Sequence, residues 1–318
     1  MTKCMVSRRL AANLSRMRSL AAVVLGCVLF LGGCAATQLP GSVPTAPSPA
    51  ARRSTGIAQL KYGTYEWSVA DLMRRWKAGT LWSLLASKHV DDVLLGFDDT
   101  YIHKCSTVKG ASEMNAMIAQ AARHGVSVEL LLGDPGWILP SGIPGLKQIL
   151  LDLRKVRFAG LDLDLEPNEI KGVPVVTAFE DLAAAMHAYI EASPWPVSID
   201  VNHIYVDAAA VREYGYCLMC ALQRAGLKHA NLMTYVSDPK KVIADVAPIL
   251  ARYPSVDFTI AQSVENRSVL PVWDSYWSDG FDVFYRDMQQ LDAALKTAKN
   301  YTGLTIESLY YLERMKAR

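Results

Sequence analysis

The sequence predicts an α/β chain whose folded part is a single (β/α)8 TIM barrel, and three observations predict it. From residue 61 onward, short apolar stretches typical of strands alternate strictly with longer amphipathic stretches typical of helices. This order produces a parallel sheet with helical crossovers. Eight strand patterns fall within about 250 residues, the usual number and length for this barrel. No glycine-rich dinucleotide fingerprint follows the first strand, which argues against an open doubly wound sheet.

Each strand pattern is an apolar run of the length of one barrel strand. We expect strands at residues 61–67, 91–98, 126–133, 158–166, 196–205, 229–236, 256–264 and 302–307. We expect helices at residues 69–87, 109–124, 143–155, 175–192, 207–225, 239–252 and 281–299, with a short last helix at 308–316.

The first 33 residues have the pattern of a signal peptide: a basic start without acidic residues, then an apolar run over 20–33 that is too short for a comfortable membrane span. The run ends in Leu-Gly-Gly-Cys at Cys34, which resembles the bacterial lipobox. The resemblance implies that Cys34 carries lipid and anchors the protein to a membrane. An ordinary signal peptide with a chance cysteine is the alternative. Ala35 after the cysteine resembles the sorting pattern for the outer membrane, where we expect the protein to face the periplasm.

Residues 34–55 are rich in Pro, Ser, Thr and Ala, and we expect a flexible tether there. The barrel then occupies residues 56–318, an ordinary size for one large domain. The first 33 residues hold five of the 33 Lys and Arg and none of the 31 Asp and Glu, so the rest of the chain carries 28 basic and 31 acidic residues. This mildly acidic balance argues against nucleic acid as a partner.

Three of the six cysteines lie in the predicted barrel: Cys105, Cys217 and Cys220. Cys217 and Cys220 are three residues apart in a helical pattern, without the second pair of a zinc site or the strand-to-helix setting of a redox motif. We interpret the three as buried small hydrophobic residues. One disulfide in an oxidising compartment is the alternative.

The strand pattern at 158–166 carries three carboxylates on one face. Because side chains alternate across a strand, Asp162, Asp164 and Glu166 point into the barrel while the leucines between them face the helices. Inward carboxylates are costly unless they are hydrogen-bonded, protonated or used, and their proximity raises at least one pKa. A carboxyl with a raised pKa at the solvent-facing end, as at Glu166, suits a general acid. A buried ion-pair network and a degenerate enzyme that only binds are the alternatives.

This stretch resembles the Asp-Gly-x-Asp-x-Asp-x-Glu signature of the family 18 glycoside hydrolases, the chitinases and endo-N-acetylglucosaminidases. Gly160, Asp162, Asp164 and Glu166 match the signature, and Ala159 replaces its first Asp. The resemblance implies that Glu166 protonates the glycosidic oxygen. It also implies that Asp164 supports the acetamido group of the substrate, which acts as the nucleophile.

A second match to that family lies on the sixth strand, where its pattern is Met-x-Tyr-Asp. Met233 and Tyr235 match, and Val236 replaces the Asp. The resemblance implies that the Tyr235 hydroxyl helps to hold the acetamido oxygen. The family's Trp on the last strand, a floor for the sugar, has no counterpart near Glu307.

A second glycosidase interpretation uses other residues. Many retaining barrel glycosidases place the acid/base on strand four, here Glu166, and the nucleophile on strand seven, here Glu265. That mechanism requires the two carboxyls about 5–5.5 Å apart. The Asn that usually precedes the acid is Leu165 in this chain.

Sugar sites combine aromatic platforms with polar side chains, and the predicted strand ends provide both. The expected substrate-binding residues are Trp67, Asp98, Trp137, Asp200, Asn202, Met233, Glu265, Trp273 and Glu307. Trp273 belongs to the loop 266–280, and long loops in compact domains are often functional.

Other chemistries find little support in the motifs. There is no metalloprotease His-Glu-x-x-His, nucleophile elbow or phosphate loop, so we expect neither metal nor cofactor. We predict a lipid-anchored glycoside hydrolase that cleaves an envelope or exported polysaccharide. The alternatives are a non-catalytic polysaccharide-binding lipoprotein on the same barrel and a scaffold of an envelope assembly, which would need an apolar surface patch.

Overall fold

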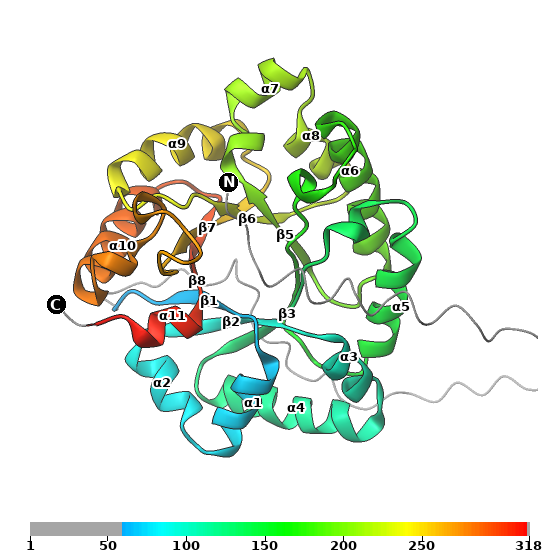
Figure 1. The fold of residues 1–318 in the computed structure, drawn as a ribbon, viewed down its shortest axis with the longest axis vertical. Coiled ribbons are helices and arrows are strands. Elements are labelled where there is room, and N and C mark those ends of the chain that lie inside the picture. Colours follow the sequence, from blue (N-terminus) through cyan, green and yellow to red (C-terminus); the bar gives the residue numbers. More distant parts are fainter. Residues whose placement is uncertain (1–58, 317–318) are drawn as a thin grey trace, which may run out of the picture. The chain divides into compact units, whose positions relative to one another are not determined.

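The computed structural model describes residues 59–316. Parallel strands in this part of the chain close into a barrel in sequence order, with the last strand paired to the first (Figure 1). The strands are β1 (Tyr62–Glu66), β2 (Val90–Gly96), β3 (Ser127–Leu132), β4 (Leu161–Leu163), β5 (Val197–Asn202), β6 (His229–Met233), β7 (Asp257–Ser263) and β8 (Tyr301–Glu307). The predicted (β/α)8 barrel is therefore confirmed.

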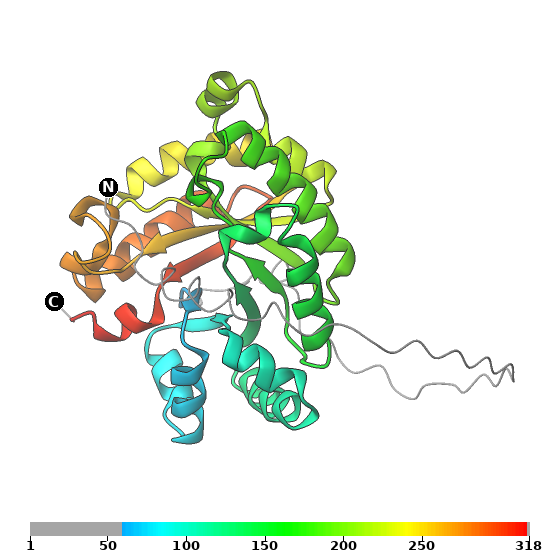
Figure 2. The ribbon, with the colours of Figure 1, turned by 45° about the vertical axis from the view of Figure 1, so that its right-hand side comes forward.

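The helices surround the strands on the outside of the barrel (Figures 1 and 2). They are α1 (Val69–Lys77), α2 (Leu81–Ser87), α3 (Asp99–Ser106), α4 (Val108–Arg123), α5 (Ile143–Leu153), α6 (Val175–Ala192), α7 (Ala208–Tyr214), α8 (Leu218–Arg224), α9 (Pro239–Arg252), α10 (Phe281–Leu295) and α11 (Leu309–Arg314).

The hydrophobic core has two parts because each strand has two faces. The larger cluster lies between the strands and the helices and includes the fully buried Leu161, Leu163 and Leu165. A small cluster lies inside the barrel and consists of Tyr65, Leu94, Leu131, Met233 and Ala261. The rest of the barrel interior is unusually polar, with buried Asp and Asn side chains on β4, β5 and β6. These buried polar side chains indicate that the candidate site lies inside the barrel.

Two predicted helices are each divided in the structure. Gly79, with φ of +72°, separates α1 from α2, and Gly215, with φ of +63°, ends α7 before α8. Glycine adopts this left-handed conformation without a Cβ penalty, so each position stops a helix that apolar periodicity alone extends. The short helix α3 was not expected from the periodicity. Its start is fixed by Asp98, whose side chain accepts a hydrogen bond from Tyr101 N at 2.8 Å.

The interpretation of Cys217 and Cys220 as small hydrophobic residues is wrong. A disulfide joins them, and both are half-buried. Cys217 is the N-cap of α8, and the two Cα atoms lie 5.2 Å apart, within the range that a disulfide spans. Cys105 is buried and unpaired.

No helix within residues 59–316 is both long and apolar enough to span a membrane. The predicted signal peptide, Cys34 with its predicted lipid and the whole predicted tether lie outside the described residues.

Candidate functional site

The carboxylate series begins on β4 and runs to the mouth of the barrel. Asp162 is fully buried, and Asp164 and Glu166 are half-buried beyond the last residue of the strand. The extended pairing continues past Leu163, since Asp164 N donates to Leu132 O at 3.0 Å. The alternation that the sequence predicts therefore persists to Glu166, with leucines on the outer face.

Asp162 is held by two donors from neighbouring strands. Its Oδ1 accepts hydrogen bonds from Ser198 Oγ at 2.5 Å and from Asn231 Nδ2 at 2.9 Å. Burial raises the pKa of Asp162 to about 6, although the hydrogen bonds from Ser198, Asp200 and Asn231 lower it.

Asp164 and Asp162 each have one buried carboxyl oxygen without a hydrogen-bond partner among the described residues, Oδ1 of Asp164 and Oδ2 of Asp162. Burial raises the pKa of Asp164 well above its usual range, and the negative charges of Glu166 and Glu307 raise it further. Within residues 59–316, no Lys or Arg forms an ion pair with Asp162 or Asp164. A buried ion-pair network therefore does not account for these two carboxyls.

Two glycines at the ends of neighbouring strands allow backbone segments at the mouth of the barrel to pack closely. A Cβ at Gly133 would lie 3.1 Å from Asp164 O, and a Cβ at Gly96 would lie 3.0 Å from Trp67 Cα. Both distances are shorter than ordinary van der Waals contacts, so a side chain at either position would require the neighbouring backbone to shift.

Glu307, at the end of β8, is fixed from two sides. Tyr235 OH donates to Glu307 Oε2, and Trp67 Nε1 donates to Glu307 Oε1 at 3.1 Å. Burial raises the pKa of Glu307, while these two hydrogen bonds lower it. The Trp67 ring is 38% exposed and stacks on Tyr65 with a centroid distance of 6.3 Å. Residues from β1, the end of β6 and β8 thus form one unit at the mouth.

Glu265 lies next to this unit, just beyond β7. Burial raises the pKa of Glu265 to about 8, and the charge of Glu307 contributes to the increase. Its backbone is restrained on both sides, because Glu265 N donates to Ser263 Oγ at 3.1 Å and Glu265 O accepts from Ser275 Oγ at 2.5 Å.

The polar residues of β5 reach the same region. Asp200 is buried and accepts a hydrogen bond from Tyr65 OH at 2.5 Å. Burial raises the pKa of Asp200 well above its usual range, as do the charges of Asp162 and Asp164. A narrow crevice of about 10 Å³ is lined by Glu166, Asp200, Asn202, Tyr205 and Met233, among others.

Several expected substrate-binding residues, among them Asp98, Trp137, Asn202 and Trp273, form no hydrogen bond with the carboxylates. Asp98 caps α3, and the Trp137 carbonyl accepts from Tyr189 OH. Trp273 is 70% exposed in its loop, where its carbonyl accepts from Ser237.

The sequence reasoning missed the roles of Tyr65 and Asn231. Tyr65 contacts Asp200 from the opposite wall of the barrel, and Asn231 contacts Asp162 from two strands away. The signal for Asn231 was present, because it alternates with Met233 and Tyr235 on β6 and so shares their inward face.

Among solved structures, a β-glucosidase from Exiguobacterium marinum is similar, with a TM-score of 0.51 at 10% identity over 75% of this chain and 78% of that chain. A GH18 chitinase from Pseudoalteromonas aurantia has a TM-score of 0.48 at 12% identity, covering 78% and 93%. A β-1,4-mannanase from the sea hare Aplysia kurodai has a TM-score of 0.45 at 11% identity, covering 82% and 92%. The shared feature is the fold. The sequence matches no protein-family model and no curated protein.

No group of three or more His, Cys, Asp or Glu within residues 59–316 is arranged to hold a metal ion. The described residues gather two sets of carboxyls at this end of the barrel: Asp164 between Asp162 and Glu166, and next to them Glu265 and Glu307.

Proposed function

We propose that the protein is a glycoside hydrolase that cleaves an envelope or exported polysaccharide containing an N-acetylated amino sugar, with Glu166 as the general acid. The observation that supports this best is the environment of Asp164, a buried carboxyl without a cationic partner between two further carboxyls. Such an arrangement is costly for folding, and groups of this kind are often found at functional sites.

The proposed reaction follows from the order of the carboxyls. Glu166 lies nearest to solvent and gives its proton to the glycosidic oxygen as the bond to the leaving sugar breaks. Glu166 then becomes negative, and Asp164 beside it, whose pKa burial raises, stabilises that charge by donating a hydrogen bond. The acetamido oxygen of the substrate forms the new bond at the anomeric carbon, as the family resemblance implies. Water then attacks the anomeric carbon and breaks that bond, and the proton that the water loses passes to the Glu166 carboxylate, which restores the acid.

The mouth supports the binding part of the proposal. Trp67 offers an exposed ring face, and its indole nitrogen is fixed by Glu307. A ring held in this way is a rigid apolar platform of the kind that packs against a sugar face. Trp273, exposed in the loop after β7, is a second candidate platform.

A second candidate function is polysaccharide binding without cleavage on the same barrel. The observation that favours it is the crevice beside Glu166, whose volume of about 10 Å³ is too small for a sugar ring. A glycan would have to lie across the crevice opening. Ala159 and Val236, which replace acidic residues of the resembled signature, favour the same alternative.

We further propose that the protein is anchored through Cys34 to the outer membrane and faces the periplasm. The support is the sequence pattern around Cys34. In that location the barrel would meet envelope glycans directly.

The test is cleavage of N-acetylglucosamine oligomers with a chromogenic leaving group by wild type, Glu166→Gln and Glu180→Gln. Glu180 is exposed on α6 and serves as the matched control. We expect Glu166→Gln to lower kcat by about 10²–10⁴-fold, the range for loss of a general acid, and Glu180→Gln to leave it unchanged. Full activity of Glu166→Gln would overturn the mechanism. Glycan binding by all three proteins with no cleavage by any would establish the binding-only alternative.

A further inference from the structure

Two hydrogen-bond donors at the mouth of the barrel are already used within the protein. The hydroxyl proton of Tyr235 goes to Glu307 Oε2, and the indole N–H of Trp67 goes to Glu307 Oε1 at 3.1 Å. A tyrosine hydroxyl has one proton to donate and otherwise accepts. Tyr235 therefore offers a substrate an acceptor while this bond exists, whereas the family resemblance implies that its hydroxyl donates to an acetamido oxygen.

The carboxyls beside Tyr235 have no positive charge paired with them. Glu265 and Glu307 lie at the ends of neighbouring strands, since Val264 N donates to Glu307 O at 2.7 Å. Within residues 59–316, no Lys or Arg forms an ion pair with either carboxyl. Arg267, two residues beyond Glu265, is exposed, and the charge that acts on Glu265 is the negative charge of Glu307.

Asp164 adds a third carboxyl to this group of acceptors. Its Oδ1 atom is buried and has no hydrogen-bond partner among the described residues. The negative charge of Glu307 raises the pKa of Asp164, so the two carboxyls share one electrostatic environment. Carboxyls that repel one another are stabilised either by a bound proton or by a cation. The mouth is therefore suited to a ligand that brings a positive charge and several donors.

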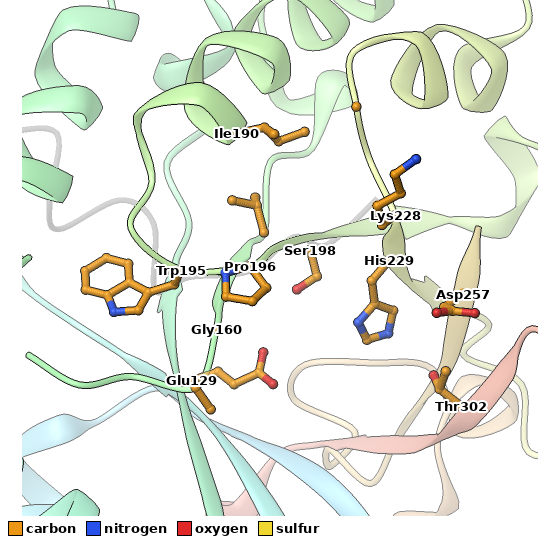
Figure 3. Close-up of a pocket in the computed structure, with 13 residues that line it drawn as sticks. Glu129, Gly160, Ile190, Trp195, Pro196, Ser198, Lys228, His229, Asp257 and Thr302 are labelled. Carbon is orange, nitrogen blue, oxygen red and sulfur yellow. The ribbon is translucent and has the colours of Figure 1, made fainter. Parts of the chain in front are cut away.

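The polar cavity at the amino ends of the strands has a different character. Its volume is about 340 Å³. Figure 3 shows Lys228 and His229 around the same space as Glu129 and Asp257, so that basic and acidic side chains line it together. Among the described residues, the excess of acidic side chains is therefore a feature of the mouth and not of both ends of the barrel.

We propose that Glu265, Glu307 and Tyr235 bind the ammonium group of a de-N-acetylated amino sugar, so that the substrate is a polymer with both N-acetylated and free amino groups. This inference rests on the proposed function and narrows its substrate. An ammonium group has a positive charge and three N–H donors, and its hydrogen bonds to carboxylates are among the strong ones. Trp67 presents a partly exposed ring beside Glu307, and a sugar packed on that ring brings its substituents close to the carboxyls.

The two kinds of sugar unit occupy different parts of the mouth. The proposed reaction uses an acetamido group on the unit whose bond is cleaved, next to Glu166 beyond β4. Glu265 and Glu307 follow β7 and β8, which lie across the closed barrel from β4. The ammonium group therefore belongs to another unit of the same chain. Recognition of that unit would select polymers that have lost part of their acetyl groups.

The first experiment measures binding without cleavage. Isothermal titration calorimetry near neutral pH compares an N-acetylglucosamine tetramer with the same tetramer after partial de-N-acetylation. The protein carries Glu166→Gln throughout, so that neither ligand is consumed. Glu265→Gln and Glu307→Gln each remove one proposed contact with little change of shape. Glu180→Gln removes the same charge from an exposed position on α6 and is the matched control.

We expect the partly de-N-acetylated tetramer to bind at least about tenfold more tightly, since its ammonium group forms charge-assisted hydrogen bonds, and the preference to decrease at high salt. Glu265→Gln and Glu307→Gln should each remove most of this preference, and Glu180→Gln should leave it unchanged. Equal affinity for the two tetramers, or an unchanged preference in both Gln variants, would overturn the inference. Circular dichroism checks folding, and Glu265→Gln preserves the test if Glu307→Gln does not fold.

The second experiment separates this inference from the proposed function. Wild type is given the fully N-acetylated and the partly de-N-acetylated polymer, and the release of reducing ends is measured. Equal cleavage of both polymers would overturn the inference and leave the proposed function intact. Preferential binding of the de-N-acetylated tetramer without cleavage of either polymer would overturn the hydrolysis and leave the ammonium site intact. Binding of neither tetramer would overturn both.

Discussion

At the residue scale, the carboxyls of the barrel interior differ in the hydrogen-bond donors that contact them. Asp162 has two donors, Ser198 and Asn231, and Glu307 has two others, Tyr235 and Trp67. Asp164, between these groups, has a buried oxygen without a donor, and so does Asp162 at its Oδ2. Burial raises the pKa of all three carboxyls, and hydrogen bonds lower it at Asp162 and Glu307.

Replacing Tyr235 with Phe tests the coupling at the mouth. The substitution removes the hydrogen bond that lowers the pKa of Glu307. We expect the Glu307 pKa to rise, because the ionised carboxylate loses a hydrogen bond that stabilises it relative to the protonated acid. Carbon NMR titration of labelled Glu carboxyls measures it, with Tyr310→Phe on the exposed face of α11 as control. An unchanged titration would show that the contact carries no energy.

Glu265 gives a pH dependence of stability with a defined sign. Its pKa is raised in the folded protein from 4.5 to about 8. The folded state therefore binds the proton more tightly than the unfolded state, and the resulting stabilisation is complete below pH 4.5 and lost as the pH rises to about 8. We expect the free energy of unfolding to fall across this range, and to fall less steeply in Glu265→Gln. Urea unfolding at both ends of the range measures the slopes, and equal slopes would contradict the assignment.

At the element scale, β4 shows how one short strand serves two purposes. Only Leu161–Leu163 count as strand, yet the backbone remains extended and paired through Asp164. Its leucines pack against the helices while its carboxyls project inward. The apolar packing of the outer layer must therefore compensate for the polar groups of the interior.

Helix α5 allows a matched test of that outer layer. Leu150 is 0% exposed and Leu151 is 50% exposed, although they are neighbours in the same helix. We expect Leu150→Ala to lower the free energy of unfolding by about 2–5 kcal/mol, because it leaves a cavity. We expect Leu151→Ala to change it by less than about 0.5 kcal/mol. Chemical denaturation of the two variants measures both, and similar losses would contradict the packing described for α5.

At the scale of the whole molecule, the barrel has polar space at both ends. The carboxyl ends hold the crevice with Glu166, and the amino ends hold the larger cavity with Glu129 and His229. Asp162 accepts a hydrogen bond from Ser198, which lines the larger cavity. The two polar spaces are a property of the closed barrel and of no single element.

The proposed anchor is tested on the whole protein in its cell. We expect Cys34→Ser to move the protein from the membrane fraction to the soluble fraction, since a lipid chain supplies the membrane affinity. Cys27→Ser, within the predicted signal peptide, serves as control. Fractionation with labelled fatty acid measures both location and lipidation. A membrane-bound, unlabelled wild type would exclude the lipid anchor.

The sequence alone determined the order of strands and helices, because apolar periodicity is a local property that can be recognised without knowledge of tertiary contacts. It also determined which side chains of β4 point inward, since alternation depends only on an extended backbone. The helix breaks at Gly79 and Gly215 were not predicted, because the apolar periodicity continues across each glycine and does not reveal its positive φ.

The tertiary structure decided which side chains meet. Tyr65 reaches Asp200 across 135 residues of sequence, and Trp67 reaches Glu307 across 240 residues because β8 closes onto β1. These contacts depend on barrel register and closure, which no local pattern encodes. The same holds for the Cys217–Cys220 disulfide, since their spacing in the sequence is compatible with either a free or a bonded pair. The inward carboxyls could therefore be predicted from the sequence, whereas their hydrogen-bond partners are determined by the closure of the barrel.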